Sequence, residues 1–546
     1  MSAESLRSPW FWLTLLALAL LGLFVLYPLI NILTASVTGE GQNGWSRLIA
    51  TPHYLEAIRN TLILATAVTL IATAIGVPLA YVTARYSFAG KGLIALLPLI
   101  TLVIPEVIAA QTWLMMLGNN GLITRFLRDF GIRLPSFYGW FGLITSMSFI
   151  YYTYVYIGVV AAIGKFDVQL EEAAQSLGTA PGRSRLHVML PVILPAILAS
   201  ALLVFTMTVG NFAISMILSH RLPLLSVVTY QAAVAEGARD ITMQSTLASV
   251  SVLIVMLVLF LNRRIVARGK YEIVQGRGAR PVPLRGLSGL AVALPAGLVV
   301  LVSLLPLISI MLGAFTASRG PVMQWGTWTL DNLARVFITA PQPLINSLTY
   351  SGIATVISTA FTALVSYLVV KKPNLLTPFV DYISAIPLAL SGTVLGVGLL
   401  ATFHGGWLPL SGTASIIVLA YVIRRMPFGM RNGQATLHNI PNSLEEASIS
   451  LGVPPVKTFF KVVLPVMLPA VASAAILTWT TTVAELSASI LVYSGGRETL
   501  PIQVFRLIDS GLMAYASAYG LVLVAVILIP IIVASKVFRI DVFSSK

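Results

Sequence analysis

Long apolar stretches alternate with short polar segments along the whole chain. A helix of about 20 mainly apolar residues is long enough to cross a bilayer. Six such stretches lie near 10–34, 57–84, 93–117, 139–163, 190–218 and 243–262. Six more lie near 288–314, 345–370, 378–402, 412–430, 463–492 and 514–536. The pattern predicts an all-α integral membrane protein with about 12 transmembrane helices.

The composition supports lipid as the solvent for much of this surface. The chain is 57% hydrophobic and only 10% charged, with a mean hydropathy of +0.91, whereas soluble domains are roughly 25% charged. The first apolar stretch is too long for a signal peptide, so we expect it to remain as a membrane helix. There is no cysteine, which excludes disulfides and thiolate chemistry.

Basic residues predict how the spans are oriented. The net charge is +15, and the densest basic cluster, within 262–286, has seven Lys or Arg and one acid, Glu272. Basic clusters at span ends are typical of cytoplasmic loops. No folded basic domain accompanies this one, so we expect no nucleic-acid partner. An even number of spans then places both termini in the cytoplasm.

The two halves of the chain repeat each other. Residues 170–196 read LEEAAQSLGTAPGRSRLHVMLPVILPA and residues 444–470 read LEEASISLGVPPVKTFFKVVLPVMLPA, with 15 of 27 positions identical at an offset of 274. A fixed offset indicates a duplicated unit, and six spans per half make the repeats parallel. We predict a first transmembrane repeat at 1–262, a basic cytoplasmic linker at 263–286 and a second repeat at 287–546.

The repeated segment lies in a predicted cytoplasmic loop, where membrane packing does not demand such similarity. Its acids suit the first turn of a helix, and Gly178 is a typical helix terminator. Small residues (Ala173, Ala174, Ala447 and Ser448) would let another protein approach closely. The duplicated loop therefore favours docking to a partner surface that is itself present twice.

These motifs resemble the EAA loop of ABC importer permeases. The resemblance is carried by Glu172, Ala173, Ala174, Gly178, Leu190 and Pro191, and again by Glu446, Ala447, Ser448, Gly452, Leu464 and Pro465. It covers essentially the whole chain, which looks like two permeases fused into one; only Ser448 departs from the pattern, by one small residue for another.

The resemblance implies a type I ABC importer permease fold in the bacterial inner membrane. In that family the loop forms a coupling helix that sits in a groove of an ATPase subunit. Two copies of a cytoplasmic ATPase and an extracytoplasmic solute-binding protein are the implied partners. The implied contact residues are Glu171, Glu172, Ala173, Ala174, Gly178, Glu445, Glu446, Ala447, Ser448 and Gly452.

The chain has no phosphate-binding loop of its own. The nearest text, YSFAGKGLI at 86–94, lacks the upstream glycine and the following Ser or Thr of that motif. We therefore expect no enzymatic activity and no directly bound cofactor, with ATP and Mg²⁺ used by the partner ATPase. The five histidines show no close metal-ligand spacing, so no metal site is expected.

Three polar residues are candidates for the translocation pathway. Ionisable side chains at membrane depth are costly and tend to face a cavity. Glu485 lies in TWTTTVAELSASILV, and 274 positions earlier stands Asn211. Glu106 follows a proline that can unwind a span. Glu485 could equally bond a neighbouring helix, and the depth of Glu106 depends on where its span begins.

Fused permeases of this length most resemble those for ferric iron, and the stretch at 496–511 is similar to theirs. An acidic pathway would also suit a cation. Thiamine, phosphonate or polyamine remain alternative cargoes, because no residue selects among solutes. A secondary transporter with two six-helix halves is the main alternative from another class, although it would not need the paired loops.

Overall fold

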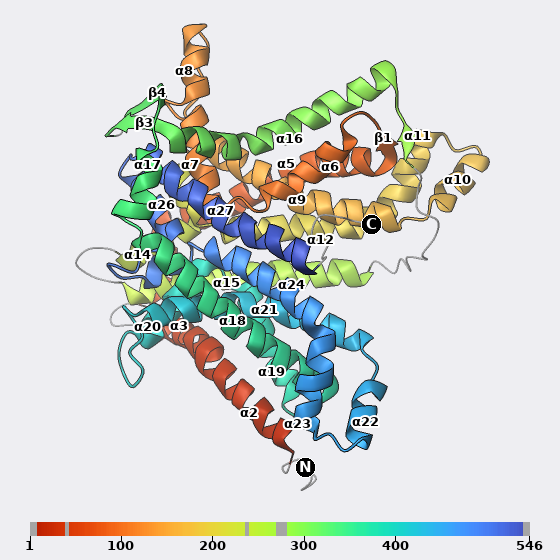
Figure 1. Cartoon of the computed structure of the whole chain (residues 1–546). Coiled ribbons are helices and arrows are strands. Elements are labelled where there is room, and N and C mark those ends of the chain that lie inside the picture. Colours follow the sequence, from red (N-terminus) through yellow and green to blue (C-terminus); the bar gives the residue numbers. More distant parts are fainter. Residues whose placement is uncertain (1–7, 39–42, 235–239, 269–280, 321, 539–546) are drawn as a thin grey trace. The chain divides into compact units, whose positions relative to one another are not determined.

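The computed structural model describes residues 8–38, 43–234, 240–268, 281–320 and 322–538 (Figure 1). Within these ranges almost all of the regular structure is helical. Residues 269–280 of the predicted linker and the outermost residues of both termini lie outside the described ranges.

The first half contains these elements: α2 (Pro9–Leu21), η1 (Gly22–Leu26), α3 (Tyr27–Thr38), α4 (Gly44–Ala50), α5 (Pro52–Arg85), α6 (Lys91–Thr101), α7 (Glu106–Leu117), α8 (Leu122–Asp129), α9 (Trp140–Lys165), α10 (Val168–Ser176), α11 (Pro181–Ser184), η2 (Arg185–Met189), α12 (Leu190–Val209), α13 (Ala213–Leu218), α14 (Leu225–Val234) and α15 (Ile241–Arg268).

The second half contains these: α16 (Gly286–Phe315), α17 (Asp331–Ala334), η3 (Arg335–Thr339), α18 (Gln342–Lys371), α19 (Thr377–Ala385), η4 (Ile386–Ala389), α20 (Gly392–Phe403), α21 (Ala414–Asn439), α22 (Ser443–Ser450), α23 (Pro455–Thr458), η5 (Phe459–Val463), α24 (Leu464–Val483), α25 (Ser489–Val492), α26 (Leu500–Asp509) and α27 (Met513–Phe538). Strands are short: β1 (Tyr86–Ser87) pairs in parallel with β2 (Val282–Pro283), and β3 (Thr316–Arg319) pairs antiparallel with β4 (Val322–Trp328).

The described residues contain nine helices that are long and apolar enough to cross a membrane, or up to eleven if two bent pairs count as one span each. The bent pairs, Lys91–Thr101 with Glu106–Asp129 and Thr377–Leu388 with Gly392–Phe403, replace the straight spans expected near 93–117 and 378–402. The tenth predicted span, 412–430, corresponds to α21. That helix falls outside this set, and Arg424 and Arg425 interrupt its apolar stretch.

The duplication extends to the order and bounds of the helices. Each of α9, α11, η2 and α12 has a counterpart exactly 274 positions later, in α21, α23, η5 and α24 respectively. α21 is thus the counterpart of α9, which is itself long and apolar enough to cross a membrane. In each half, three helices pack on one another: α5, α9 and α12 in the first, and α18, α21 and α24 in the second.

The chain divides into two compact units that exchange segments between the sequence halves. Unit 1 takes its described residues from Met1–Thr51, Val228–Val252 and Ala314–Val542, and unit 2 from Pro52–Val227 and Leu253–Gly313. In unit 1, α2 packs on α18 and α19, where Trp10 lies edge-on to Tyr367 with ring centroids 5.2 Å apart. In unit 2, Ser303 of α16 shares a hydrogen bond of 3.0 Å with Tyr152. The predicted division at 263–286 rests on sequence similarity and stays a prediction.

In both halves a glycine lets two long helices pack closely, but the glycine lies on a different helix of the pair in each half. On α5, a Cβ at Gly76 would lie 2.9 Å from the Cβ of Val155 on α9. On α21, a Cβ at Gly429 would lie 2.5 Å from Oγ1 of Thr362 on α18. Gly429 is the counterpart of Val155 at the offset of 274. Both crossings are therefore close, but a different helix of the pair carries the small residue in each half.

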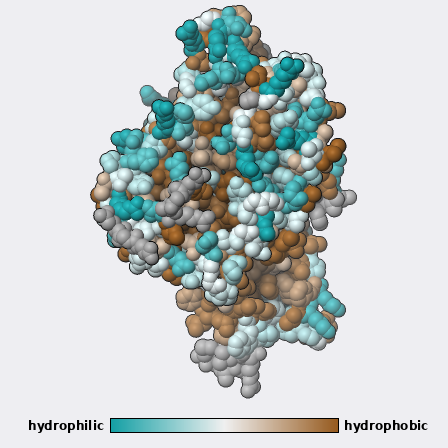
Figure 2. Space-filling view, turned by 90° about the vertical axis from the view of Figure 1, so that its left-hand side faces the viewer, coloured by the Kyte–Doolittle hydropathy of each residue, from teal (hydrophilic) through white to brown (hydrophobic). Residues whose placement is uncertain are grey.

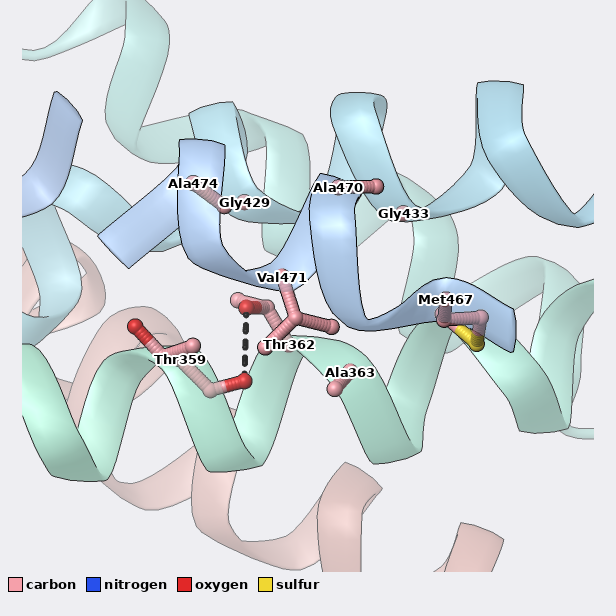
Figure 3. Close-up of a pocket in the computed structure, with 9 residues that line it drawn as sticks. All are labelled: Thr359, Thr362, Ala363, Gly429, Gly433, Met467, Ala470, Val471 and Ala474. Carbon is pink, nitrogen blue, oxygen red and sulfur yellow. Dashed lines mark hydrogen bonds between the residues drawn. The ribbon is translucent and has the colours of Figure 1, made fainter. Parts of the chain in front are cut away.

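In unit 1, α18, α21 and α24 border a small pocket (Figure 3). Its lining residues carry no charge and few polar atoms: Thr359, Thr362, Ala363, Gly429, Gly433, Met467, Ala470, Val471 and Ala474. Thr362 donates to the carbonyl of Thr359 within its own helix. We attribute this pocket to the small residues of the crossing rather than to ligand binding.

Exposed apolar side chains continue along the spanning helices. Figure 2 shows hydrophobic residues gathered in broad patches on one face of the surface. Exposed residues of this kind on α5, α15 and α16 include Leu62, Leu70, Leu253, Leu257, Leu298 and Leu301. Patches of this extent are rare on soluble monomers, so they are consistent with contact to lipid.

We expect Gly429→Ala to destabilise the protein by about 1–3 kcal/mol, because the added methyl overpacks the contact with Thr362. Thr362→Ala should recover most of that loss in the double variant, since it removes the atoms that clash. Thermal unfolding of the four proteins in a double-mutant cycle measures the coupling.

Gly164→Ala is the matched control, because a Cβ there has no atom within 4 Å. It should leave the midpoint unchanged or raise it slightly. Additive effects of the two substitutions at the crossing would contradict this interpretation.

Candidate functional site

Each LEEA segment folds into a short helix, a left-handed glycine turn and a second helical turn. We call residues 167–184 elbow 1 and residues 442–458 elbow 2. In elbow 1, the Asp167 side chain accepts a hydrogen bond from the amide of Gln169 at 3.0 Å, which caps α10. Gly178 has φ +87° and Gly452 has φ +83°. This conformation suits glycine because it has no Cβ.

The hydrogen bonds after the two helices match. In elbow 1 the amide of Gly178 donates to the carbonyl of Gln175 and that of Thr179 to Ala174, at 2.9 and 3.0 Å. In elbow 2 the amides of Gly452 and Val453 donate to the carbonyls three and five residues before them, at 2.9 and 3.1 Å. Paired bonds of this kind satisfy carbonyls that a helix end leaves free.

The first glutamate of each pair is buried and anchors the elbow. Glu171 is 2% exposed and forms ion pairs with Arg85, at the end of α5, and with Arg185 at 3.7 Å. Its counterpart Glu445 forms an ion pair of 2.7 Å with Lys372, just after α18. Each elbow is thus tied by charge to the end of a long helix.

A tyrosine near the end of each long helix completes this anchor. The guanidinium of Arg185 lies 5.8 Å from the ring centroid of Tyr81, and the ammonium of Lys372 lies 5.7 Å from that of Tyr367. Both distances are within the range of cation–π attraction. The same arrangement of acid, base and aromatic ring therefore recurs in both halves with different basic residues.

The second glutamate of each pair lies on the outside. Glu172 and Glu446 are exposed, as are Ala173, Ala447, Gly178 and Gly452, while Ala174 is half-buried. Ser448 is buried and shares a hydrogen bond of 3.0 Å with Thr458. The predicted contact residues therefore separate into an exposed set and an anchoring set of Glu171, Glu445 and Ser448. Contact of the exposed set with an ATPase stays a prediction.

Sequence reasoning missed a hydrophobic residue at the tip of each elbow. Leu177 is 89% exposed and Leu451, its counterpart, is 84% exposed. A leucine held this far into solvent on an ordered turn suits a pocket on another protein. Its place directly before the glycine in both copies of LEEA was the available signal.

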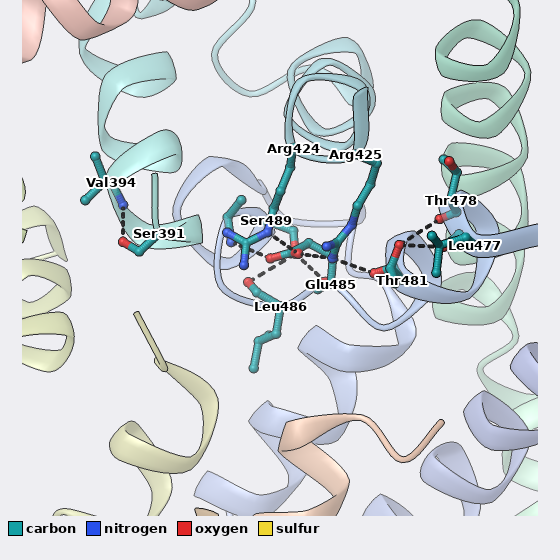
Figure 4. Close-up of polar contacts among 11 residues, drawn as sticks. Ser391, Val394, Arg424, Arg425, Leu477, Thr478, Thr481, Glu485, Leu486 and Ser489 are labelled. Atoms are coloured by element: carbon teal, nitrogen blue, oxygen red, sulfur yellow. Dashed lines mark hydrogen bonds and ion pairs between the residues drawn. The ribbon is translucent and has the colours of Figure 1, made fainter. Parts of the chain in front are cut away.

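In the second half, Glu485 lies in a buried charged cluster in unit 1 (Figure 4). Its carboxylate forms an ion pair with Nε of Arg424 at 2.8 Å and accepts a hydrogen bond from Nη2 of Arg425 at 2.6 Å. It also accepts from the backbone amide of Ala488 at 3.1 Å. Arg425 donates in addition to the carbonyl of Thr481 at 2.7 Å.

In the first half, Asn211 occupies the corresponding place in a cluster with Tyr151 and Glu106 in unit 2. Its side-chain oxygen accepts from the amide of Ile214 at 3.0 Å, the counterpart of the bond to Ala488. Its side-chain nitrogen donates to the Tyr151 hydroxyl at 2.8 Å, and that hydroxyl donates to Glu106 at 2.6 Å. The structure therefore brings Asn211 and Glu106 together through a tyrosine.

The repeat offset relates the partners as well as the predicted residues. Tyr151 and Arg425 are 274 positions apart, as are Asn211 and Glu485. Sequence reasoning identified the second pair and missed the first, although the same offset applied to 139–163 would have indicated it. Whether these clusters line the pathway stays a prediction.

The charged residues of the described chain include no group of three or more His, Asp or Glu that could hold a metal ion. Glu106 and Glu485 each engage the hydroxyl or guanidinium groups just described.

Comparison with known proteins places these features in a family. The model of the binding-protein-dependent transport system inner membrane component matches residues 355–540. The ferric transport system permease protein FbpB of Actinobacillus pleuropneumoniae is 26% identical over 524 residues, covering 92% of this chain and 75% of that protein. The Fe(3+)-transport system permease protein FbpB 2 of Haemophilus influenzae is 27% identical over 538 residues, covering 97% and 99% respectively.

A further relative, a probable molybdenum ABC transporter permease protein of Haloferax volcanii, is 31% identical over 217 residues, which cover 39% of this chain and 76% of that protein. The chain therefore belongs to the family of binding-protein-dependent transport system inner membrane components. It is a multi-pass membrane permease of an ABC importer, similar to ferric transport permeases along most of its length. As a permease subunit it is not itself an enzyme, as the missing phosphate-binding loop predicted.

We expect Glu171→Gln to lower the stability of the permease by about 3 kcal/mol, because it leaves Arg85 buried beside a neutral partner. Thermal unfolding of the purified chain measures the change.

Glu172→Gln is the matched control, because it alters the adjacent, exposed carboxylate and should leave the unfolding midpoint within error. Equal midpoints for Glu171→Gln and the wild type would contradict the anchoring role.

Proposed function

We propose that this chain is the membrane pathway of a ferric iron importer in the bacterial inner membrane and that each elbow binds one cytoplasmic ATPase subunit. Both termini then face the cytoplasm. An extracytoplasmic solute-binding protein delivers the cargo on the other side. ATP and Mg²⁺ are used by the ATPase, and this chain binds no cofactor itself.

The observation that carries the proposal is the separation of each elbow into exposed residues and buried anchoring residues. The exposed carboxylates of Glu172 and Glu446, with the exposed side chains of Leu177 and Leu451, form two equivalent surfaces for a partner. Two copies of one partner can bind two equivalent surfaces in the same way, so no second kind of partner is needed.

The buried anchors supply a route from that partner to the membrane helices. A force on elbow 1 acts on α5 through the Glu171–Arg85 pair, and a force on elbow 2 acts on α18 through Glu445–Lys372. Each elbow also leads without a break into a spanning helix, through η2 into α12 and through η5 into α24. Movement of an ATPase subunit would thus displace two helices of the corresponding three-helix group: α5 and α12 in the first half, or α18 and α24 in the second.

The ferric cargo rests on the relatives whose similarity extends along most of the chain. Thiamine, phosphonate or polyamine would use the same machinery and stay alternatives. A secondary transporter needs no surface for an ATPase, so the paired elbows disfavour that class.

Substitution of the exposed elbow residues tests the coupling. We expect Glu172→Gln with Gly178→Ala, or Glu446→Gln with Gly452→Ala, to reduce co-purification of the ATPase and to lower ATP-driven uptake by about tenfold or more. The alanines disturb the left-handed turn, and the glutamines remove charge from the contact surface.

Glu56→Gln, an exposed carboxylate near the opposite end of α5, is the control and should leave both quantities unchanged. Wild-type uptake by all the elbow variants would contradict the proposal. Loss of membrane insertion would point to a folding defect instead, so insertion is measured alongside.

The cargo is tested by uptake of radioactive ferric iron into proteoliposomes that contain the permease, its ATPase and its binding protein. We expect uptake that requires ATP and the binding protein, and competition by excess unlabelled ferric iron. A cognate binding protein that carries an anion or a sugar and ignores iron would contradict the ferric assignment.

A further inference from the structure

The charged cluster in unit 1 contains one more positive charge than negative charge. The carboxylate of Glu485 meets the guanidinium groups of both Arg424 and Arg425, and the three side chains are 3%, 22% and 14% exposed respectively. The guanidinium group of arginine stays protonated in proteins. The cluster therefore carries an excess cation in a place where an uncompensated charge is costly.

Arg424 carries an unsatisfied hydrogen-bond donor. Its Nη1 atom is buried and has no hydrogen-bond partner among the described residues. That atom lies beside Gly392, where a Cβ would come within 2.3 Å of it. Gly392 is the first residue of α20, a twelve-residue helix whose N-cap is Ser391. The positive end of a helix macrodipole adds to the attraction for an anion at this point.

Packing of the helices does not require this positive charge. The first half builds the same junction with Tyr151 and Asn211, and both Asn211 and Glu485 accept an amide hydrogen bond from the residue three positions later. Ile150 stands where Arg424 stands in the second half. The equivalent helices of the first half are therefore held without arginines at these two positions, so helix packing alone does not explain the two guanidinium groups of the second half.

We propose that Arg424, Arg425 and the start of α20 form a binding site for an oxyanion group, either carboxylate or phosphate, that accompanies the cargo. This inference rests on the proposed function for its cargo. A guanidinium fork matches the paired oxygens of such a group, and the free Nη1 supplies a donor for it. A bare multivalent cation would be repelled by the cluster, whereas a ferric ion that carries carboxylate or phosphate ligands presents oxygens to it.

The site is tested on the purified full-length permease, without ATPase or binding protein. Thermal unfolding is measured with inorganic phosphate, with citrate and with ferric citrate, against chloride at equal ionic strength. We expect phosphate or citrate to raise the unfolding midpoint in a saturable way, since a ligand that binds only the folded state stabilises it. Comparison of citrate with ferric citrate distinguishes a free anion from one attached to the metal.

Arg424→Gln should weaken anion binding about tenfold or more, because charge-assisted hydrogen bonds are lost. Arg424→Lys should weaken it less, since the charge remains. Glu485→Gln should act in the opposite direction: the midpoint falls without anion, and the rise on adding anion becomes larger. Arg431→Gln is the matched control, because Arg431 lies on the same helix but its side chain is 54% exposed.

A purely structural cluster would give a different pattern. Wild-type permease that responds to phosphate and citrate no more than to chloride would overturn the proposal, as would an unchanged response in Arg424→Gln or an equal loss in Arg431→Gln. Should Arg424→Gln fail to fold, Arg424→Lys and Glu485→Gln decide the question by the opposite signs of their effects. Ferric uptake by the assembled importer is a separate measurement, so failure of either proposal is recognised independently.

Discussion

A carboxylate buried at the base of each elbow has to be neutralised, since an unpaired charge in that position costs several kcal/mol. Glu171 finds Arg85 and Arg185, and Glu445 finds Lys372. These pairs fix where each elbow sits relative to the end of a long helix. They also leave the neighbouring acid, Glu172 or Glu446, on the outside, because successive helix residues point in different directions. The exposed surface of each elbow follows from the buried pair.

The two halves agree more closely in the bounds of their helices than in the side chains that hold those helices together. The helices after each elbow begin and end at an offset of 274 residues, yet the anchoring bases differ. The glycine at the close helix crossing lies on α5 in the first half and on α21, the counterpart of α9, in the second. The polar junction contains Tyr151 and Glu106 around Asn211, whereas it contains Arg424 and Arg425 around Glu485. The same helix arrangement therefore accommodates two polar clusters of different composition.

Much of this architecture was predictable because spans and repeats leave strong local patterns. Apolar length gave the helices, and the offset gave both elbows and the pairing of Asn211 with Glu485. The bends before Glu106 and Gly392 were harder to predict, since apolar composition does not distinguish a straight span from a broken one. The burial of Glu171 and the partners of Glu485 depend on helices distant in sequence. The packing of α2 with second-half helices likewise has no local signal, because any apolar helix face can pack on another.

We propose that the two elbow tips contact two ATPase subunits. The chain contains no cysteine, so Leu177→Cys and Leu451→Cys each introduce a single reactive thiol at a tip. Cross-linking of each variant in membranes that contain the assembled importer tests the claim directly. We expect both thiols to cross-link to the ATPase and to be protected from cytoplasmic labelling by it. Labelling of either thiol from the outer side of the membrane, or no ATPase adduct from either, would contradict it.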